Sequence, residues 1–203
     1  MDHNVKKTEF KFKDNRSYVH GTDIFNNLVE QILKQFKKND QLNLKLSFKK
    51  PIHSQCIIHT SENISNIDLS NNSSAELKLK FNEFVFYYYI EEIFEPIKEK
   101  YSSYEKVIMD LAAIEDDIMT ISTNKDISFI EKVVFMNKKL LSSRVKEIKK
   151  KFFFSMIEIQ DLNKIFNINN VTLKLDRILG NKHFKSCIFV DSKNIGNLYF
   201  TLV

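Results

Sequence analysis

The chain has 203 residues, of which 43% are hydrophobic, enough for one large domain or two small fused domains with a packed core. Its formal net charge is +5, but lysine supplies almost all of the positive charge, and arginine occurs only at Arg16, Arg144 and Arg177. Because specific nucleic-acid readers depend on the bidentate arginine guanidinium, this composition argues against nucleic acid as the partner.

The first predicted element is a half-buried strand, in which Thr8, Phe10 and Phe12 alternate with polar residues up to Lys13. A turn follows it, with the sequence Tyr18-Val-His-Gly-Thr-Asp23. Since the chain contains only three glycines, we expect Gly21 to lie where the backbone needs a positive φ or approaches another group closely.

A long amphipathic helix is predicted over residues 22–38. Its apolar residues form one stripe, made of Ile24, Phe25, Leu28, Val29, Ile32, Leu33 and Phe36. We expect Thr22 or Asp23 to cap this helix by accepting an otherwise unpaired backbone N–H.

Several strands are predicted next. Alternation indicates strands over residues 42–51 and 56–60, then a polar loop over 61–74, then a strand from residue 77. The apolar phase reverses at Asn82-Glu83, which a bulge or a tight hairpin would explain.

The second half is predicted to begin with two helices between residues 92 and 151. The first carries a stripe of Tyr101, Tyr104, Val107, Ile108, Leu111, Ile114 and Ile118. Four strands follow, over residues 152–159, 171–175, 184–190 and 195–203, with a short helix near 161–166. Asp191-Ser-Lys-Asn194 is the predicted hairpin turn between the last two strands.

The order of elements in the first half resembles the hotdog fold of acyl-thioester enzymes, over residues 8–91. Two segments carry the resemblance: His20-Gly21 at the start of the long helix, and Phe48-Lys-Lys-Pro-Ile52. It implies an α+β fold in which an antiparallel sheet wraps around a helix. Residues 1–95 would form this unit, and residues 96–203 would add the helical pair and the further strands, which could form a second, degenerate hotdog-like unit.

The same resemblance implies an active site of the dehydratase or thioesterase kind. His20 would transfer the proton, with Asp23 or Glu30 as its acidic partner, while Tyr18, Gly21 and Thr22 would bind the substrate. Asp14, six residues before His20, has a setting similar to that of the thioesterase acid. The simpler interpretation is that His20 donates to a backbone carbonyl and Asp23 only caps the helix.

The implied partner is an acyl carrier protein or a coenzyme A thioester, in a fatty-acid-like or polyketide-like pathway. We expect no cofactor and no metal, because His53 and His59 would share one face of a strand while Cys56 points to the other. A single hotdog unit would need a homodimer to complete its pocket. With two distant cysteines, no signal peptide and no membrane-spanning run, we expect a cytoplasmic protein.

Two other functions fit the sequence. One is a non-catalytic α+β interaction protein whose lysine-rich surface binds an acidic protein. The other is single-stranded nucleic-acid binding on the aromatic run over residues 84–90, although this run lacks the glycines and arginines of RNA-recognition strands.

Overall fold

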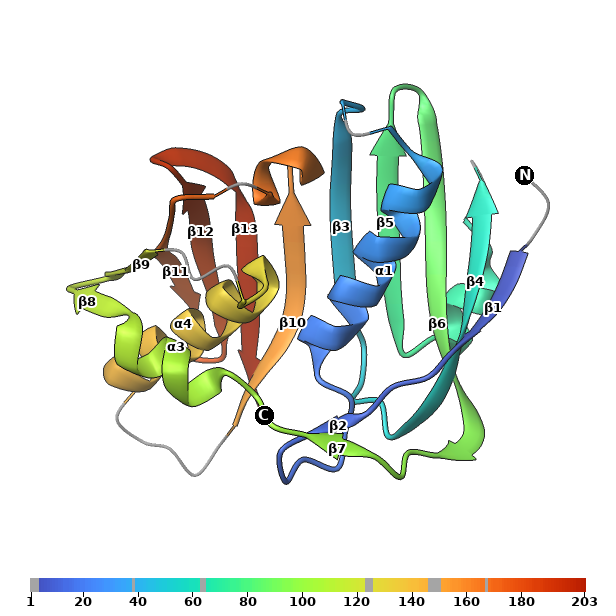
Figure 1. The fold of residues 1–203 in the computed structure, drawn as a ribbon, viewed down its shortest axis with the longest axis horizontal. Coiled ribbons are helices and arrows are strands. Elements are labelled where there is room, and N and C mark those ends of the chain that lie inside the picture. The colour runs from blue at the N-terminus through green and yellow to red at the C-terminus, as the bar shows by residue number, and fades with distance from the viewer. Residues whose placement is uncertain (1–3, 38, 63–64, 123–125, 146–150, 167) are drawn as a thin grey trace. The chain divides into compact units, whose positions relative to one another are not determined.

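The computed structural model describes residues 4–37, 39–62, 65–122, 126–145, 151–166 and 168–203. Its chain divides into two compact units, Met1–Ser103 and Tyr104–Val203. Each unit combines antiparallel strands with a few helices (Figure 1), so the predicted α+β class is confirmed. In the part of the chain described, no helix is long and apolar enough to cross a membrane.

The first unit is a curved antiparallel sheet with one long helix. Its strands are hydrogen-bonded in the order β1-β4-β6-β5-β3, while β2 and β7 form a separate parallel pair. The elements are β1 (Asn4–Thr8), β2 (Phe12–Lys13), α1 (Gly21–Gln35), β3 (Leu42–Phe48), β4 (Ser54–Glu62), α2 (Ile67–Asn72), β5 (Ala75–Phe81), β6 (Phe84–Pro96) and β7 (Lys100–Tyr101).

Helix α1 lies along one face of this sheet (Figure 1) and buries the apolar stripe read from the sequence. Ile24, Leu28 and Ile32 are almost completely buried, whereas Leu33, predicted within the stripe, is 38% exposed. The sheet supplies the facing apolar side chains, because alternate residues of β3 and β5 are buried. Burial of this stripe, rather than helix propensity, stabilises α1.

The apolar phase reverses at Asn82-Glu83 because these two residues form the turn of a tight hairpin. Strands β5 and β6 pair up to Phe81 opposite Phe84, and Asn82 takes a left-handed φ of 53°. Of the two explanations offered by the sequence, the hairpin is therefore correct. Strand β6 continues to Pro96, through residues that were predicted to begin a helix.

The second unit is also an antiparallel sheet with one long helix. Its strands follow the order β10-β13-β12-β11-β9-β8, and α4 packs against β9 and β11. The elements are α3 (Glu105–Leu111), β8 (Ala113–Glu115), β9 (Ile118–Ser122), α4 (Phe129–Arg144), β10 (Phe152–Ile159), the 3₁₀ turn η1 (Leu162–Ile165), β11 (Asn170–Leu179), β12 (His183–Val190) and β13 (Lys193–Leu202).

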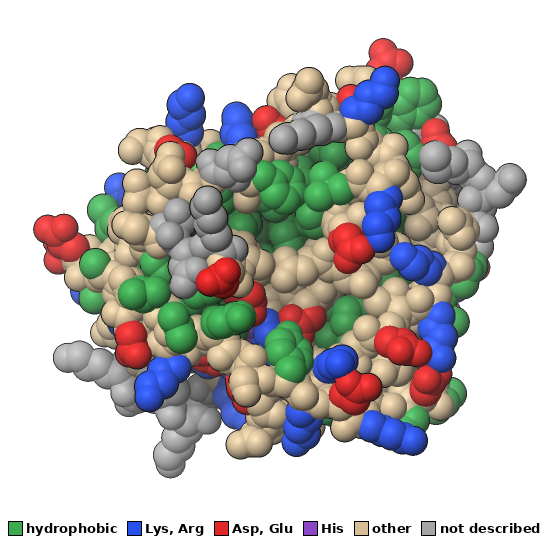
Figure 2. All heavy atoms as spheres, in the orientation of Figure 1, with side chains coloured by type: hydrophobic (Ala, Val, Ile, Leu, Met, Phe, Trp, Pro, Cys, Tyr) green, Lys and Arg blue, Asp and Glu red, His purple; other side chains and the backbone are tan. Residues whose placement is uncertain are grey.

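The prediction of a first long helix in this unit is wrong. Helix α3 ends at Leu111, and Ile114 and Ile118 lie on the β8–β9 hairpin, whose turn includes Asp116 at a φ of 46°. Apolar residues four apart, such as Ile114 and Ile118, fit a helix and a hairpin equally well. The acidic residues between them favour a turn, and this turn makes the segment a hairpin. Hydrophobic side chains are visible on the surface around α3 and β8 (Figure 2); Leu111 is 54% exposed.

The hairpin turn predicted between the last two strands is confirmed. Asp191 and Ser192 connect β12 to β13 with φ values of 46° and 68°. Two successive positive φ values are the signature of a type I′ turn, whose twist matches that of the flanking strands.

Candidate functional site

The residues just before His20-Gly21 are hydrogen-bonded to the end of the Phe48–Ile52 segment and to the residue that follows it. The backbone N–H of Val19 donates to the carbonyl of Ile52 at 2.8 Å, and His53 Nδ1 lies 2.7 Å from the carbonyl oxygen of Ser17. The chain ahead of α1 is thus fastened to the segment after β3, and this fixes where α1 begins.

His20 is the N-cap residue of α1, and Gly21 is the first helical residue. The prediction that Thr22 or Asp23 caps the helix is therefore wrong, since both lie inside its first turn. His20 has the extended backbone typical of an N-cap, φ −73° and ψ 136°, but its side chain makes no capping hydrogen bond. Gly21 has a helical backbone, and among the described residues the glycine with a positive φ is Gly180.

The parallel pair of β2 and β7 brings two further side chains to this helix start. Lys13 lies opposite Tyr101, and the backbone N–H of Asp14 donates to the Tyr101 carbonyl at 2.8 Å. Asp14 itself accepts from the Ser103 N–H at 2.8 Å and from Arg16 at 2.9 Å. Hydrogen bonding by Ser103 holds the pKa of Asp14 below its usual value. The Asp14 carboxylate therefore stabilises the local backbone by accepting from Ser103 and Arg16.

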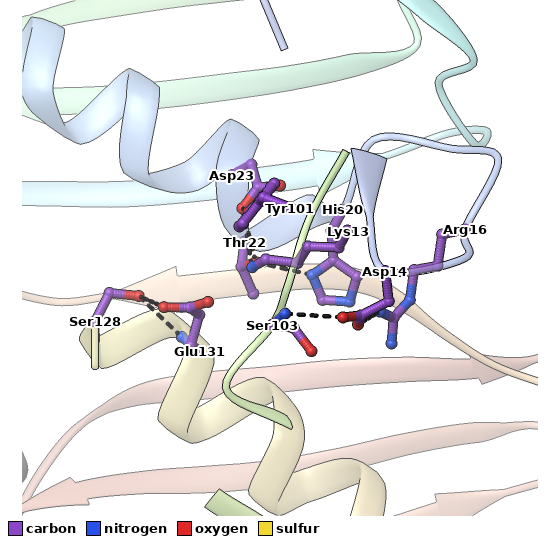
Figure 3. Close-up of polar contacts among 10 residues, drawn as sticks. All are labelled: Lys13, Asp14, Arg16, His20, Thr22, Asp23, Tyr101, Ser103, Ser128 and Glu131. Atoms are coloured by element: carbon purple, nitrogen blue, oxygen red, sulfur yellow. Dashed lines mark hydrogen bonds and ion pairs between the residues drawn. The ribbon is translucent and has the colours of Figure 1, made fainter. Parts of the chain in front are cut away.

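Lys13 is the centre of a hydrogen-bonded group (Figure 3). Its ammonium donates to Thr22 Oγ1 at 2.7 Å and lies 2.9 Å from Asp23 Oδ1. Thr22 Oγ1 is also 2.8 Å from His20 Nδ1, and the Tyr101 hydroxyl donates to Asp23 Oδ1 at 2.6 Å. The ammonium lies 5.6 Å from the centre of the Tyr101 ring, within cation–π range. We call these five residues the α1 polar group.

Most side chains of the α1 polar group are buried, unlike those of an ordinary surface cluster. The Lys13 side chain is completely buried, His20 is 8% exposed, and the Asp23 side chain is 16% exposed. Asp23 Oδ2 is buried without a hydrogen-bond partner in the described structure. Polar side chains removed from water in this way are fixed by their neighbours, and this suits a site that must hold one geometry.

The predicted site residues divide into those that the structure brings together and those that it does not. His20, Thr22 and Asp23 belong to the α1 polar group, and Gly21 and Tyr18 flank His20 in the chain. Glu30 lies ten residues after His20, about 15 Å along the helix axis. It is exposed and bonded to Lys34 at 2.6 Å, a hydrogen bond that lowers its pKa.

Sequence reasoning missed Lys13 and Tyr101. Lys13 fell on the polar side of the predicted strand over residues 8–13, which placed it in solvent. The structure instead ends β1 at Thr8 and pairs Phe12–Lys13 with β7, and this turns Lys13 inward. No local pattern relates Lys13 to Tyr101, because the two are 88 residues apart.

A second feature lies at the opposite end of α1, an open cavity of about 410 Å³. Phe36 packs there edge-on against Phe81 and Phe86, with ring centres 5.4 and 5.2 Å away. Its lining also includes Gln35, Lys37, Asp40, Glu62 and Phe84. None of these residues was predicted for the thioester site, but Phe84 and Phe86 belong to the aromatic run over residues 84–90.

Cys56 and His59 lie on β4 and His53 just precedes it, and all three make contacts within the first unit. Cys56 is buried, and burial raises the pKa of its thiol to about 12. His59 Nε2 lies 2.9 Å from Glu91 Oε2, and the backbone N–H of His53 donates to Glu92 at 2.7 Å. Over the described ranges, no three metal-ligating side chains come together.

Lysines on the surface of the first unit are widely paired with carboxylates. Lys7 lies 2.6 Å from Glu95, and Lys50 lies 3.7 Å from Glu92. On the face shown in Figure 2, positive and negative side chains are interspersed. This face therefore shows no continuous lysine-rich surface of the kind that binding to an acidic protein would use.

Comparison with known proteins identifies the fold. No protein-family model and no curated protein sequence matches the chain. Among solved structures, a candidate thioesterase II from Thermobifida fusca YX is 7% identical with a TM-score of 0.55, covering 100% of this chain and 93% of its own. A monomeric dehydratase domain from a trans-AT polyketide synthase split module is 12% identical with a TM-score of 0.51, covering all of both chains.

A third solved structure bears the fold's name. A conserved protein of unknown function with a hot dog fold, from Alicyclobacillus acidocaldarius, is 8% identical with a TM-score of 0.51, covering 98% of this chain and 92% of its own. The chain thus has a hotdog-like fold, as its sequence predicted. At such identities the likeness concerns the fold, and the chemistry must be argued from the chain's own residues.

Proposed function

We propose that this protein binds an acyl thioester of coenzyme A or of an acyl carrier, and acts on it at the N-terminus of α1. The observation that carries the proposal is the α1 polar group, in which a buried lysine, a largely buried aspartate and the exposed Tyr101 are joined to a buried histidine at the start of the hotdog helix. Solved structures of similar fold described as a thioesterase and a dehydratase support the substrate class.

The helix start supplies the electrostatics that such a substrate needs. Backbone N–H groups and the positive end of the helix dipole favour negative charge, such as that developing on a thioester carbonyl oxygen. In our proposal His20 exchanges a proton or a hydrogen bond with the substrate, while Tyr18 and the backbone at Gly21 line the binding site. Asp23, fixed by Lys13 and Tyr101, holds the negative charge that balances the buried ammonium.

Two reactions are compatible with this site. Hydrolysis adds water to the carbonyl carbon and breaks the C–S bond, so that a carboxylic acid and a thiol are released. Dehydration removes a proton from the α-carbon and a hydroxyl from the β-carbon, so that water and an enoyl thioester are formed. One panel of saturated and β-hydroxyacyl coenzyme A thioesters distinguishes them by the release of thiol or of enoyl product.

The test is the turnover of this panel by the wild type and by His20→Ala. We expect the variant to lose about 100-fold or more, the usual contribution of a proton-transferring side chain. His183→Ala is the matched control, because His183 is exposed on the second unit and should keep full activity. Full activity of His20→Ala on every thioester that the wild type turns over would remove His20 from the reaction.

We further propose that the second unit is a shortened hotdog-like unit. It repeats the arrangement of the first, with the long helix α4 packed on an antiparallel sheet. Expression of residues 104–203 alone would test its independence: a cooperative unfolding transition supports a separate unit, and an unfolded fragment contradicts it.

A further inference from the structure

The buried ammonium of Lys13 constrains the hydroxyl of Thr22. An ammonium has hydrogens to donate and no lone pair to accept with, so Thr22 Oγ1 must accept at the 2.7 Å contact. Thr22 has one hydroxyl hydrogen left to donate. Its two neighbouring acceptors are His20 Nδ1 at 2.8 Å and Asp23 Oδ1 at 3.4 Å.

Two observations indicate that Thr22 donates this hydrogen to His20: the donor–acceptor distance, and the contacts that Asp23 Oδ1 already makes. Hydroxyl donors lie about 2.5–3.0 Å from their acceptors, and only the His20 contact falls within that range. Asp23 Oδ1 is already approached by the Lys13 ammonium at 2.9 Å and accepts from the Tyr101 hydroxyl at 2.6 Å. These two contacts occupy the two lone pairs of that oxygen.

We infer that Lys13 is a positioning residue that acts through Thr22 on the tautomer of His20. When Nδ1 accepts from Thr22 it carries no hydrogen, and a neutral imidazole then carries its hydrogen on Nε2. His20 therefore presents a donor at Nε2. Lys13 is completely buried and acts without touching the substrate.

The tautomer selects between the two reactions of the proposed function, and this part of the inference rests on that function. A donor at Nε2 can polarise a thioester carbonyl, which assists attack by water. It has no lone pair with which to take a proton from the α-carbon, as dehydration requires. Hydrolysis of saturated acyl thioesters is the expected reaction, and dehydration of β-hydroxyacyl thioesters is not.

The tautomer can be measured without any substrate. Nitrogen chemical shifts of the ring in ¹⁵N-histidine-labelled protein separate the two neutral tautomers, and His20→Gln assigns the His20 signals. Wild type and Thr22→Ser should show the hydrogen on Nε2, because serine keeps the hydroxyl. Thr22→Val and Lys13→Met should move the population toward Nδ1–H. Lys34→Met, on the exposed Lys34–Glu30 pair, is the control that should change nothing.

The wild-type spectrum decides even if the Lys13 variant does not fold. A hydrogen on Nδ1 in the wild type, or an unchanged tautomer in Thr22→Val, would overturn the inference. These results are independent of whether any thioester is turned over, so they separate this inference from the proposed function. Where turnover is found, Thr22→Val should lower kcat with little change in KM, and Thr22→Ser should restore it. Dehydration as the main activity would contradict the reaction assigned here.

Discussion

The starts of α1 and α4, the long helix of each unit, are built differently. Ser128 caps α4 by accepting from the Glu131 N–H at 3.4 Å, and its hydroxyl donates to the Glu131 carboxylate at 2.9 Å (Figure 3). This is the Ser-x-x-Glu arrangement expected of a stable helix start. At α1 the N-cap is a histidine without a capping bond, and Thr22 and Asp23 bond to Lys13 instead.

The difference is the one we expect if the start of α4 serves stability and the start of α1 is, as we propose, a functional site. A side-chain cap contributes about 1 kcal/mol, and α1 forgoes it while burying an ammonium and a carboxylate beside the same turn. Locally unfavourable choices of this kind are expected at functional sites, where the geometry of particular atoms matters more than stability.

The largest effect is expected from Lys13→Ala. Removing the ammonium leaves the largely buried Asp23 carboxylate without its charge partner, which we expect to cost about 3–5 kcal/mol of unfolding free energy. Chemical denaturation measures it. The matched control is Lys34→Ala, which breaks an exposed lysine–carboxylate pair and should change stability little.

A double-mutant cycle then locates the cause of that loss. Lys13→Ala combined with Asp23→Ala should cost clearly less than the sum of the single changes, because the charge left unpaired by the first is removed by the second. Additive losses would mean that Lys13 and Asp23 stabilise the unit separately.

A smaller loss is expected from Ser128→Ala at α4. It removes the cap from a helix start that is built for stability, and we expect it to cost about 1 kcal/mol. Thermal unfolding monitored by circular dichroism would detect this loss as a lower Tm. An unchanged Tm would mean that the capping contacts of Ser128 do not stabilise α4.

His20→Asn should change the unfolding free energy little, because a gain and a loss offset each other. Asparagine is among the best N-cap residues, so it can supply the bond that His20 does not make, for a gain of up to about 1 kcal/mol. Loss of the His20 contact to Thr22 subtracts from this gain, so the net change should be small. A loss of several kcal/mol in chemical denaturation would show that His20 has a structural role instead.

The smallest effect concerns pH. Burial acts to raise the pKa of Glu92, but hydrogen bonds from the His53 N–H, Ser74 and Ser54, together with Lys50, hold it below the usual 4.5. A carboxyl whose pKa is lower in the folded state stabilises the protein above its unfolded pKa. This contribution is lost as the pH falls from about 4.5 through the folded pKa.

Glu92→Gln is the variant that isolates this contribution. Its unfolding free energy should fall less than that of the wild type between pH 5 and the folded pKa of Glu92, as followed by urea denaturation across that range. Parallel pH profiles for the two proteins would show that other carboxyl groups cause the acid sensitivity.

The sequence predicted the elements whose side chains repeat with one clear period. Helix α1 was recognisable because its stripe from Ile24 to Ile32 runs without interruption, and β3 because every second residue is apolar. The β8–β9 hairpin was missed because Ile114 and Ile118 satisfy the helical spacing as well. The turn at Asp116 and the strand pairing of β8 and β9 distinguish the two structures.

The candidate site was predictable in part. His20 and Asp23 could be found, because both lie at the start of a helix that was itself predicted. Lys13 and Tyr101 could not, because a parallel pairing between distant short strands places them there. Burial of a lysine is exceptional, so composition and alternation assign it to the surface. The contacts that fix the histidine therefore become visible only in the structure.

The most direct test of a chemical role for the α1 start is the rate at which His20→Asn turns over acyl coenzyme A thioesters. The rate should be measured on protein whose unfolding free energy has been shown to match the wild type. We predict a loss of about 100-fold or more, because an asparagine side chain that caps the helix cannot also donate a hydrogen bond to the thioester carbonyl oxygen from the position of His20 Nε2. Wild-type turnover by this folded variant would contradict the account and leave the α1 polar group with a structural role alone.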